Sequence, residues 1–174
     1  MSDEVRVRPA EPGDAAAFVQ LARAVGEEPG GWLLGTSEWR SVGDERRYLK
    51  ALRRHPGAAA FAAELPGGRV VGRLSLAREG HPASAHVADL GLMVDAGHRR
   101  RGVGTALLQA ATAWAGGVGV TKLELHVFPW NEPALALYEG FGFVREGYRR
   151  RHYRRQGEEV DAILMALFVG ESET

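Results

Sequence analysis

The stretch VADLGLMV at Val87–Val94, followed by DAGHRRRGVG at Asp95–Gly104 and TALLQAATAW at Thr105–Trp114, decides the fold of this chain. The first block is mostly apolar and has the length of a buried strand. In the last block, apolar side chains recur at the spacing of one helix face: Leu107, Leu108, Ala111 and Trp114. The pattern predicts a strand, a glycine-containing turn and a helix, and the glycine pair at 116–117 is predicted to end that helix.

The turn between this strand and this helix has the features of an anion site. The first turn of a helix carries backbone N–H groups without internal partners, and the helix dipole makes that end positive. Gly102 and Gly104 allow a ligand to approach the backbone, and three arginines at 99–101 add charge. A pyrophosphate fits such a turn. A P-loop run is absent, and Leu107 stands where a Rossmann turn needs its third glycine.

The remaining pattern, arginine-x-x-glycine-x-glycine at 99–104, resembles the pyrophosphate-binding signature of the GNAT superfamily of acyl-CoA-dependent N-acyltransferases. A second block, NEPALALYEGFGF at Asn131–Phe143, is similar to the other half of the GNAT acyl-CoA site, an Asn-x-x-Ala-x-x-x-Tyr helix followed by a Gly-Phe turn. The resemblance spans roughly Val5–Val169 and is specific from about Asp89 to Phe143.

The resemblance implies an α/β (α+β) fold: a mixed, mostly antiparallel central sheet flanked by helices, in one N-acetyltransferase domain over residues 1–174. The element order along the chain is expected to be β-α-α-β-β-β-α-β-α-β-β. Strands are expected at 5–8, 58–65, 70–77, 87–94, 123–127, 147–155 and 160–168, and helices at 15–25, 42–55, 105–114 and 133–139.

Composition narrows the class of protein. The 174 residues carry a formal net charge of zero, so no overall field draws the chain to nucleic acid or to a membrane. The absence of cysteine excludes a disulfide, a thiolate metal site and a cysteine nucleophile, and the six histidines lack metal-ligand spacing. The acidic start and the lack of a long apolar run lead us to expect a cytoplasmic protein without a membrane span.

The implied co-substrate is acetyl-CoA, with no metal. By resemblance, backbone amides of the turn bind its pyrophosphate. The residues that the resemblance assigns to this role are Arg99, Arg100, Arg101, Gly102, Val103, Gly104 and Thr105. The alternative is a basic turn that is only solvated. Gly91 lies in mid-strand, where glycine often marks a bulge or a close backbone approach. The family splays two strands apart here, and an amide near Met93 or Val94 then donates to the thioester oxygen. The alternative is that Gly91 only relieves crowding.

Tyr138 is the general acid by resemblance. A phenol has a pKa near ~10, so it stays protonated at neutral pH and can protonate the departing thiolate. A core tyrosine on an amphipathic helix is the alternative. Asn131 is expected to bind the pantetheine arm, to cap the short helix, or both.

The base that deprotonates the amine is less determined. Asp89 occupies the strand position where many GNAT relatives carry an acid, and it is our candidate; its rival role is that of an exposed or substrate-binding carboxylate. Glu27, Glu28, Glu79 and His126 are the other options. His126 alternates with its apolar neighbours, so a half-buried strand histidine is favoured over a catalytic one.

The predicted activity is acetyl transfer from acetyl-CoA to a primary amine by direct attack in a ternary complex. The acceptor is a small-molecule amine or a peptide or protein N-terminus. A polyamine or aminoglycoside would need a strongly acidic pocket, and only Glu27-Glu28 and Asp44-Glu45 offer acidic clusters, so a neutral or anionic amine is preferred. A non-catalytic acyl-CoA-binding or sensing module is the alternative. Because relatives often dimerise, a homodimer is left open.

Two further stretches allow two interpretations each. GYRRRHYRR at 147–155 interleaves arginine with aromatics as RNA-binding strands do, but charge on both faces suits an edge strand protected from aggregation, which we favour. The apolar patch Trp32-Leu33-Leu34 either forms part of the acceptor pocket, as in the family, or anchors a loop in the core.

Overall fold

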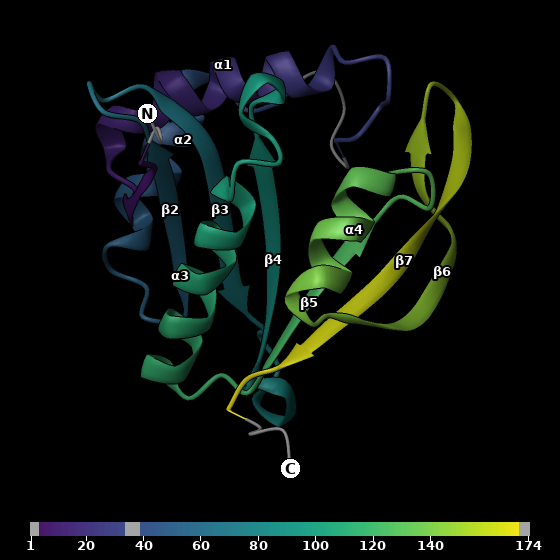
Figure 1. Cartoon of the computed structure of the whole chain (residues 1–174). Coiled ribbons are helices and arrows are strands. Elements are labelled where there is room, and N and C mark those ends of the chain that lie inside the picture. Colours follow the sequence, from purple (N-terminus) through teal and green to yellow (C-terminus); the bar gives the residue numbers. More distant parts are fainter. Residues whose placement is uncertain (1–3, 34–38, 171–174) are drawn as a thin grey trace.

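The computed structural model describes residues 4–33 and 39–170, and within them seven strands form one sheet (Figure 1). The strand order is β1-β2-β3-β4-β5-β7-β6, and every neighbouring pair is antiparallel except β4 and β5. The strands are β1 (Arg6–Pro9), β2 (Ala58–Glu64), β3 (Val70–Arg78), β4 (Val87–Val94), β5 (Lys122–Val127), β6 (Val144–Arg155) and β7 (Glu158–Phe168). The predicted mixed, mostly antiparallel sheet and the predicted element order are confirmed.

Four α-helices cover the sheet within the described ranges: α1 (Ala15–Gly26), α2 (Val42–Leu52), α3 (Val103–Val118) and α4 (Glu132–Phe141). Side chains of β2 alternate between two layers, because Ala60 and Ala62 pack with α1 and α2 whereas Ala63 joins the core under α3. The two N-terminal helices therefore lie on one face of the sheet, and α3 and α4 lie on the other (Figure 1).

The two parallel strands separate along their length. Their pairing covers only Val87–Asp89 against Lys122–Glu124, although β4 continues to Val94 and β5 to Val127. Beyond that point β4 stays paired with β3, and β5 stays paired with β7. Figure 1 shows the two strands meeting at their lower ends and diverging above. The splay expected from the resemblance is thus present, and it opens a passage through the sheet.

The helix after the phosphate turn is longer than predicted. The prediction that the pair at Gly116-Gly117 ends it is wrong, because α3 continues to Val118 and ends at Gly119, which adopts a left-handed φ of 77°. Ala115 is fully buried and Val118 packs on the core, so tertiary contacts offset the roughly 1 kcal/mol that a helical glycine costs. The other predicted elements are present with their ends shifted by a few residues. No helix of 4–33 and 39–170 combines the length and the apolar character that crossing a membrane requires.

The arginine-rich stretch forms β6, the edge strand of the sheet, as predicted. Its side chains are almost all exposed, so charge stands on both faces of the edge. A bulge interrupts its pairing with β7 between Arg149 and Tyr153, where Arg151 has a left-handed φ of 53°. Gln156 and Gly157 both have positive φ, which is the geometry of a two-residue type I′ hairpin turn.

Candidate functional site

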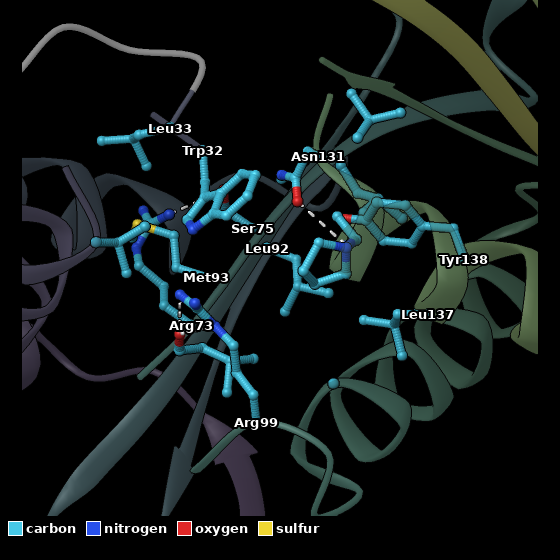
Figure 2. Close-up of a pocket in the computed structure, with 18 of the residues that line it drawn as sticks. Trp32, Leu33, Arg73, Ser75, Leu92, Met93, Arg99, Asn131, Leu137 and Tyr138 are labelled. Carbon is cyan, nitrogen blue, oxygen red and sulfur yellow. Dashed lines mark hydrogen bonds between the residues drawn. The ribbon is translucent and has the colours of Figure 1, made fainter. Parts of the chain in front are cut away.

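One cavity of about 570 Å³ passes through the opening between β4 and β5 (Figure 2). On one side it is lined by the turn before α3 and by α4; on the other it is lined by residues near α1 and by β3. Of the predicted site residues it brings together Met93, Val94, Arg99, Arg100, Gly102, Gly104, Thr105, Asn131 and Tyr138. Among the described residues, the predicted Asp89, Arg101 and Val103 are not part of its lining.

The turn before α3 presents unpaired amides to the cavity. Gly102 is the N-cap residue with a left-handed φ of 83°, and the first intrahelical bond of the α3 N-terminus runs from the Ala106 amide to the Gly102 carbonyl at 2.9 Å. The amides that precede Ala106 in the first turn therefore have no carbonyl partner within the helix. Because Gly102, Gly104 and Thr105 line the cavity, this end of α3 offers N–H groups and a positive dipole to an anion.

The two glycines of the motif meet different requirements. A Cβ at Gly102 would touch nothing within 4 Å, so its positive φ alone requires glycine. A Cβ at Gly104 would lie 2.6 Å from Leu137 Cδ2, so this glycine lets α3 and α4 approach beside the cavity. Arg100 also has a left-handed φ, 60°, which completes the tight path of the turn.

The charge that Arg99 brings to the turn is paired with a carboxylate. Its guanidinium makes two hydrogen bonds of 2.7 Å to the carboxylate of Glu28, and it also donates to the Val94 carbonyl at 3.1 and 3.2 Å. Glu28 accepts a further hydrogen bond from the Trp32 indole at 2.8 Å. Arg99 therefore fixes the segment after α1 to the end of β4, and Glu28 is bound in an ion pair instead of being available as a base.

Two amides of β4 point into the splay. The Asp95 amide donates to the Val71 carbonyl at 2.8 Å, so its N–H faces β3. N–H groups alternate in direction along a strand, so the Met93 amide also faces β3, whereas the Leu92 and Val94 amides face the opening. Of the two predicted donors, only Val94 has this orientation, and Leu92 is a donor that the sequence did not reveal.

Gly91 does not relieve crowding in this structure. A Cβ added there would meet nothing within 4 Å, and the residue lines the cavity. Gly91 pairs with Ser75 of β3, and a side chain at position 91 would point to the face of the sheet that α1 covers. A side chain at position 91 would therefore occupy the passage itself.

Tyr138 lies in the core and also reaches the cavity. Its side chain is only 6% exposed and packs against Phe143 with ring centroids 5.6 Å apart, yet it lines the cavity (Figure 2). Burial raises the pKa of its phenol, so the hydroxyl keeps its proton at neutral pH. Asn131 is the N-cap of α4, because its side chain accepts from the Ala134 amide at 3.2 Å. The predicted cap is confirmed, and the pantetheine contact stays a prediction.

His126 lies on β5 at the edge of the passage. It is half-buried, as predicted, and it lines the cavity, which the sequence interpretation did not favour. Its Nδ1 lies 2.7 Å from the Tyr153 hydroxyl. Burial and, to a smaller extent, the charge of Arg149 lower the pKa of the imidazole, so the ring is neutral at physiological pH. Its alternation with buried neighbours on a strand beside the splay was the signal that could have identified it.

Asp89 stands at the point where the two parallel strands part. It pairs in register with Glu124, the last pair before the splay, and its side chain keeps exposed surface. Partial desolvation of the carboxyl by the surrounding protein, together with the charges of Glu79 and Glu124, raises the pKa of Asp89 to about 6. Burial raises the pKa of the Tyr153 phenol, and the charge of Asp89 adds to that rise.

On the side of the cavity that faces α1 and β3, the structure reveals a buried ion cluster that sequence reasoning missed. Glu45 is fully buried, and its oxygens accept hydrogen bonds of 3.0 Å from Arg73 Nε and from Arg40 Nη1. Arg73 also donates to the Ser75 hydroxyl at 3.0 Å. The acidic pair at 44–45 had been considered as one cluster, but Asp44 is exposed and only Glu45 enters the core.

The apolar patch after α1 contacts both the cavity and the core. Trp32 and Leu33 line the cavity and also pack on the cluster that contains Met93. The indole of Trp130 donates to the Gly30 carbonyl at 3.0 Å, which holds this segment against the other side of the splay. The remaining residue of the patch, Leu34, lies outside the described ranges.

Comparison with known proteins gives consistent relationships. The model of the acetyltransferase (GNAT) family matches residues 25–143. The chain is 35% identical over 123 residues to the L-amino acid N-acetyltransferase AaaT of Escherichia coli K12, covering 70% of this chain and 75% of that protein. It is 34% identical over 140 residues to the N-alpha-acetyltransferase RimI of Mycobacterium tuberculosis, covering 79% and 80% of the two chains.

A solved structure, the GNAT-family acetyltransferase from Streptococcus pneumoniae, superposes with a TM-score of 0.84 at 26% identity. The match covers 95% of this chain and all of that one. The similarity therefore extends over both sides of the splay and includes the elements that line the cavity.

Proposed function

The chain belongs to the GNAT acetyltransferase family, and we propose that it moves the acetyl group of acetyl-CoA to the primary amine of a small molecule within one ternary complex. The observation that carries this proposal is the single cavity that runs through the splayed sheet. A donor held on the α3–α4 side and an amine entering from the α1 side would meet between β4 and β5. No cysteine is present to carry a covalent acyl intermediate, so direct attack is the mechanism we favour.

The residues around the turn fit acetyl-CoA. The amides of Gly104 and Thr105, the left-handed backbone at Gly102 and the exposed side chain of Arg100 would hold the pyrophosphate. Asn131 uses its oxygen as a cap, which leaves its NH₂ group for the pantetheine arm. When bound, acetyl-CoA supplies the acetyl group as an activated thioester.

The amides of Leu92 and Val94 would polarise the thioester carbonyl. Both are aimed at the splay by the alternation of β4, and neither has a partner strand there because the ladder to β5 has ended. Fixed donors at the place where negative charge develops lower the barrier to acyl transfer without reorganisation.

Tyr138 would donate its hydroxyl proton to the departing sulfur. Its raised pKa keeps that proton on the oxygen until the thiolate forms. We assign the base to His126 in place of Asp89, because the imidazole lines the cavity and its lowered pKa keeps it neutral. Asp89 is not part of the described lining of the cavity, and we keep it as the alternative base.

A small-molecule acceptor has more support than a protein N-terminus. The relative AaaT acts on L-amino acids by its name, whereas RimI acts on α-amines. The described lining of the cavity contains four arginines and no carboxylate: Arg40, Arg73, Arg99 and Arg100. Such a lining disfavours a polycationic amine and favours a neutral or anionic one.

Thiol release from acetyl-CoA, followed with a thiol-reactive dye, tests the proposal on a panel of amines and short peptides. The protein contributes no thiol of its own because it lacks cysteine. Turnover with small amines that Tyr138→Phe abolishes is the expected result. A protein that CoA stabilises against heat, but that acetylates nothing in the panel, would support the non-catalytic sensing module.

A further inference from the structure

The acceptor side of the cavity carries an excess of positive charge. Glu45 is the acid that contacts Arg73 and Arg40, and these two arginines already bind both of its oxygens. It lies beneath the cavity wall, with none of its surface exposed. Two guanidinium groups against one carboxylate leave one positive charge without a counter-ion in this cluster.

Arg73 retains a donor without a hydrogen bond. The side chain is 6% exposed, its Nε donates to Glu45, and its Nη1 donates to Ser75 Oγ. Its Nη2 lies 2.9 Å from Glu45 Oε1, but no acceptor among residues 4–33 and 39–170 aligns with it for a hydrogen bond. Buried donors of charged groups rarely lack a hydrogen bond, so an acceptor atom on a ligand would supply the one that Arg73 Nη2 lacks.

The position of Arg73 suits a group attached next to the reacting amine. Arg73 pairs with Met93 across β3 and β4, and Ser75 pairs with Gly91. The guanidinium and the hydroxyl therefore stand one strand away from the Leu92 amide at the splay. Figure 2 draws Arg73, Ser75 and Trp32 on one side of the cavity, facing Asn131 and Tyr138. An α-amino acid carries its carboxylate one carbon from its amine, so a carboxylate bound by this pair would leave the amine close by, on the side of the splay.

We propose that Arg73 and Ser75 form a carboxylate subsite, so that the acceptor is an α-amino acid with a free carboxylate. This inference rests on the proposed acetyl transfer and specifies its substrate. The guanidinium Nη2 would donate to one carboxylate oxygen, and the Ser75 hydroxyl to the other. Arg40 adds attraction from the rim of the cavity, where its side chain is 43% exposed.

Apolar residues around the subsite define the rest of the acceptor. Trp32, Leu33 and Trp39 line the same side and pack with Met93 in one cluster. They would contact the side chain of the amino acid, so large apolar or aromatic side chains are favoured over charged ones. L-phenylalanine is therefore the first probe.

The first measurement compares three acceptors that share one side chain: L-phenylalanine, L-phenylalaninamide and phenethylamine. A charge-assisted hydrogen bond to the carboxylate predicts that kcat/KM is roughly 10- to 100-fold higher for the acid than for the amide. The decarboxylated amine is expected to behave like the amide. Equal kcat/KM values for the acid and the amide would overturn the subsite.

The second measurement locates the preference in the protein. Arg73→Gln alone leaves Glu45 with a reduced set of partners in the core and endangers folding, so the test uses Arg73→Gln combined with Glu45→Gln. In this double variant, the ratio of kcat/KM for L-phenylalanine to kcat/KM for L-phenylalaninamide should be close to one, while the amide is still acetylated. The ratio is measured within one preparation, so it does not depend on the folded fraction. Ser75→Ala is expected to lower the ratio by a smaller factor.

A matched control removes another partly buried arginine–carboxylate pair. Arg8 and Asp14 are joined by hydrogen bonds of 2.8 and 2.9 Å away from the cavity, so Arg8→Gln with Asp14→Asn should leave the ratio unchanged. A ratio that survives in the Arg73 variant, or that the control also abolishes, contradicts the assignment. If amines are acetylated but the carboxylic acid is not preferred over the amide, only the carboxylate subsite is contradicted. If no amine is acetylated, both the proposed function and the subsite are contradicted.

Discussion

Replacing Glu45 with glutamine tests how the acceptor side of the cavity is held together. The carboxylate has no exposed surface and neutralises Arg73, whose side chain is only 6% exposed. Glutamine keeps the shape but removes the charge, so the guanidinium of Arg73 stays buried without a counter-ion. Breaking a buried pair in this way costs about 3–5 kcal/mol, a large part of the ~5–15 kcal/mol by which a domain is stable.

Glu139→Gln is the matched control. Glu139 is also a helical glutamate with an arginine partner, Arg145, whose Nε lies 2.9 Å from it, but the two side chains are 48% and 56% exposed. Exposed pairs of this kind contribute less than about 1 kcal/mol. Urea unfolding followed by circular dichroism gives both free energies. Equal losses in the two variants, both below about 1 kcal/mol, would refute the reasoning from burial.

Adding Arg73→Gln to Glu45→Gln extends the test. The double variant no longer buries an isolated charge, so it is expected to be more stable than Glu45→Gln alone. The two changes are therefore strongly non-additive, as residues in direct contact usually are. A double variant less stable than either single one would show that the cluster holds the core by packing and not by charge neutralisation.

Five other substitutions test the site and its surroundings. Tyr138→Phe should lower kcat by roughly 10²–10⁴ with little change in acetyl-CoA affinity, and an unchanged kcat would remove the acid assignment. His126→Gln should lower kcat/KM by about 10² or more, and the same loss in Asp89→Asn with His126 intact would transfer the role of base to Asp89. The pKa of Asp89 is raised to about 6 in the folded state, above its unfolded value, so ionisation of Asp89 lowers the free energy of unfolding as pH rises from about 4 to about 6. Across this window, the free energy of unfolding of the wild type should therefore fall relative to that of Asp89→Asn. Parallel plots of this free energy against pH would contradict the raised pKa. Gly102→Ala should destabilise the protein by about 1–3 kcal/mol because of its left-handed φ, whereas Gly116→Ala, in open helical space, should stabilise it by up to about 1 kcal/mol; thermal melts that rank them otherwise would contradict this account.

The acyl-CoA half of the site could be predicted because its parts are close in the sequence. The apolar run of β4, the glycine at 102 and the helical spacing after it lie within a few turns of chain, and each acts through its neighbours. Tyr138 follows the helix cap Asn131 by seven positions in the same way. Local conformational preferences and hydrophobic periodicity are sufficient for such features.

The ion pairs around the cavity could not be predicted, because they join distant parts of the chain. The partner of Arg99, Glu28, is 71 residues away, and Arg73 and Glu45 are 28 residues apart. Nothing in the pattern around Glu45 distinguishes it from its exposed neighbour Asp44. Burial separates the two, since one faces β3 and the other faces solvent.

The sequence by itself determined the order of strands and helices, the anion turn and the family of the protein. Only the tertiary structure decided which amides of β4 are unpaired, that α3 continues through its glycine pair, and that His126 reaches the cavity while Asp89 stays outside its lining. The physical reason is that a side chain's chemistry depends on the charges and the solvent around it. Those surroundings arise when elements far apart in the chain pack together, and they leave no trace in the spacing of nearby residues.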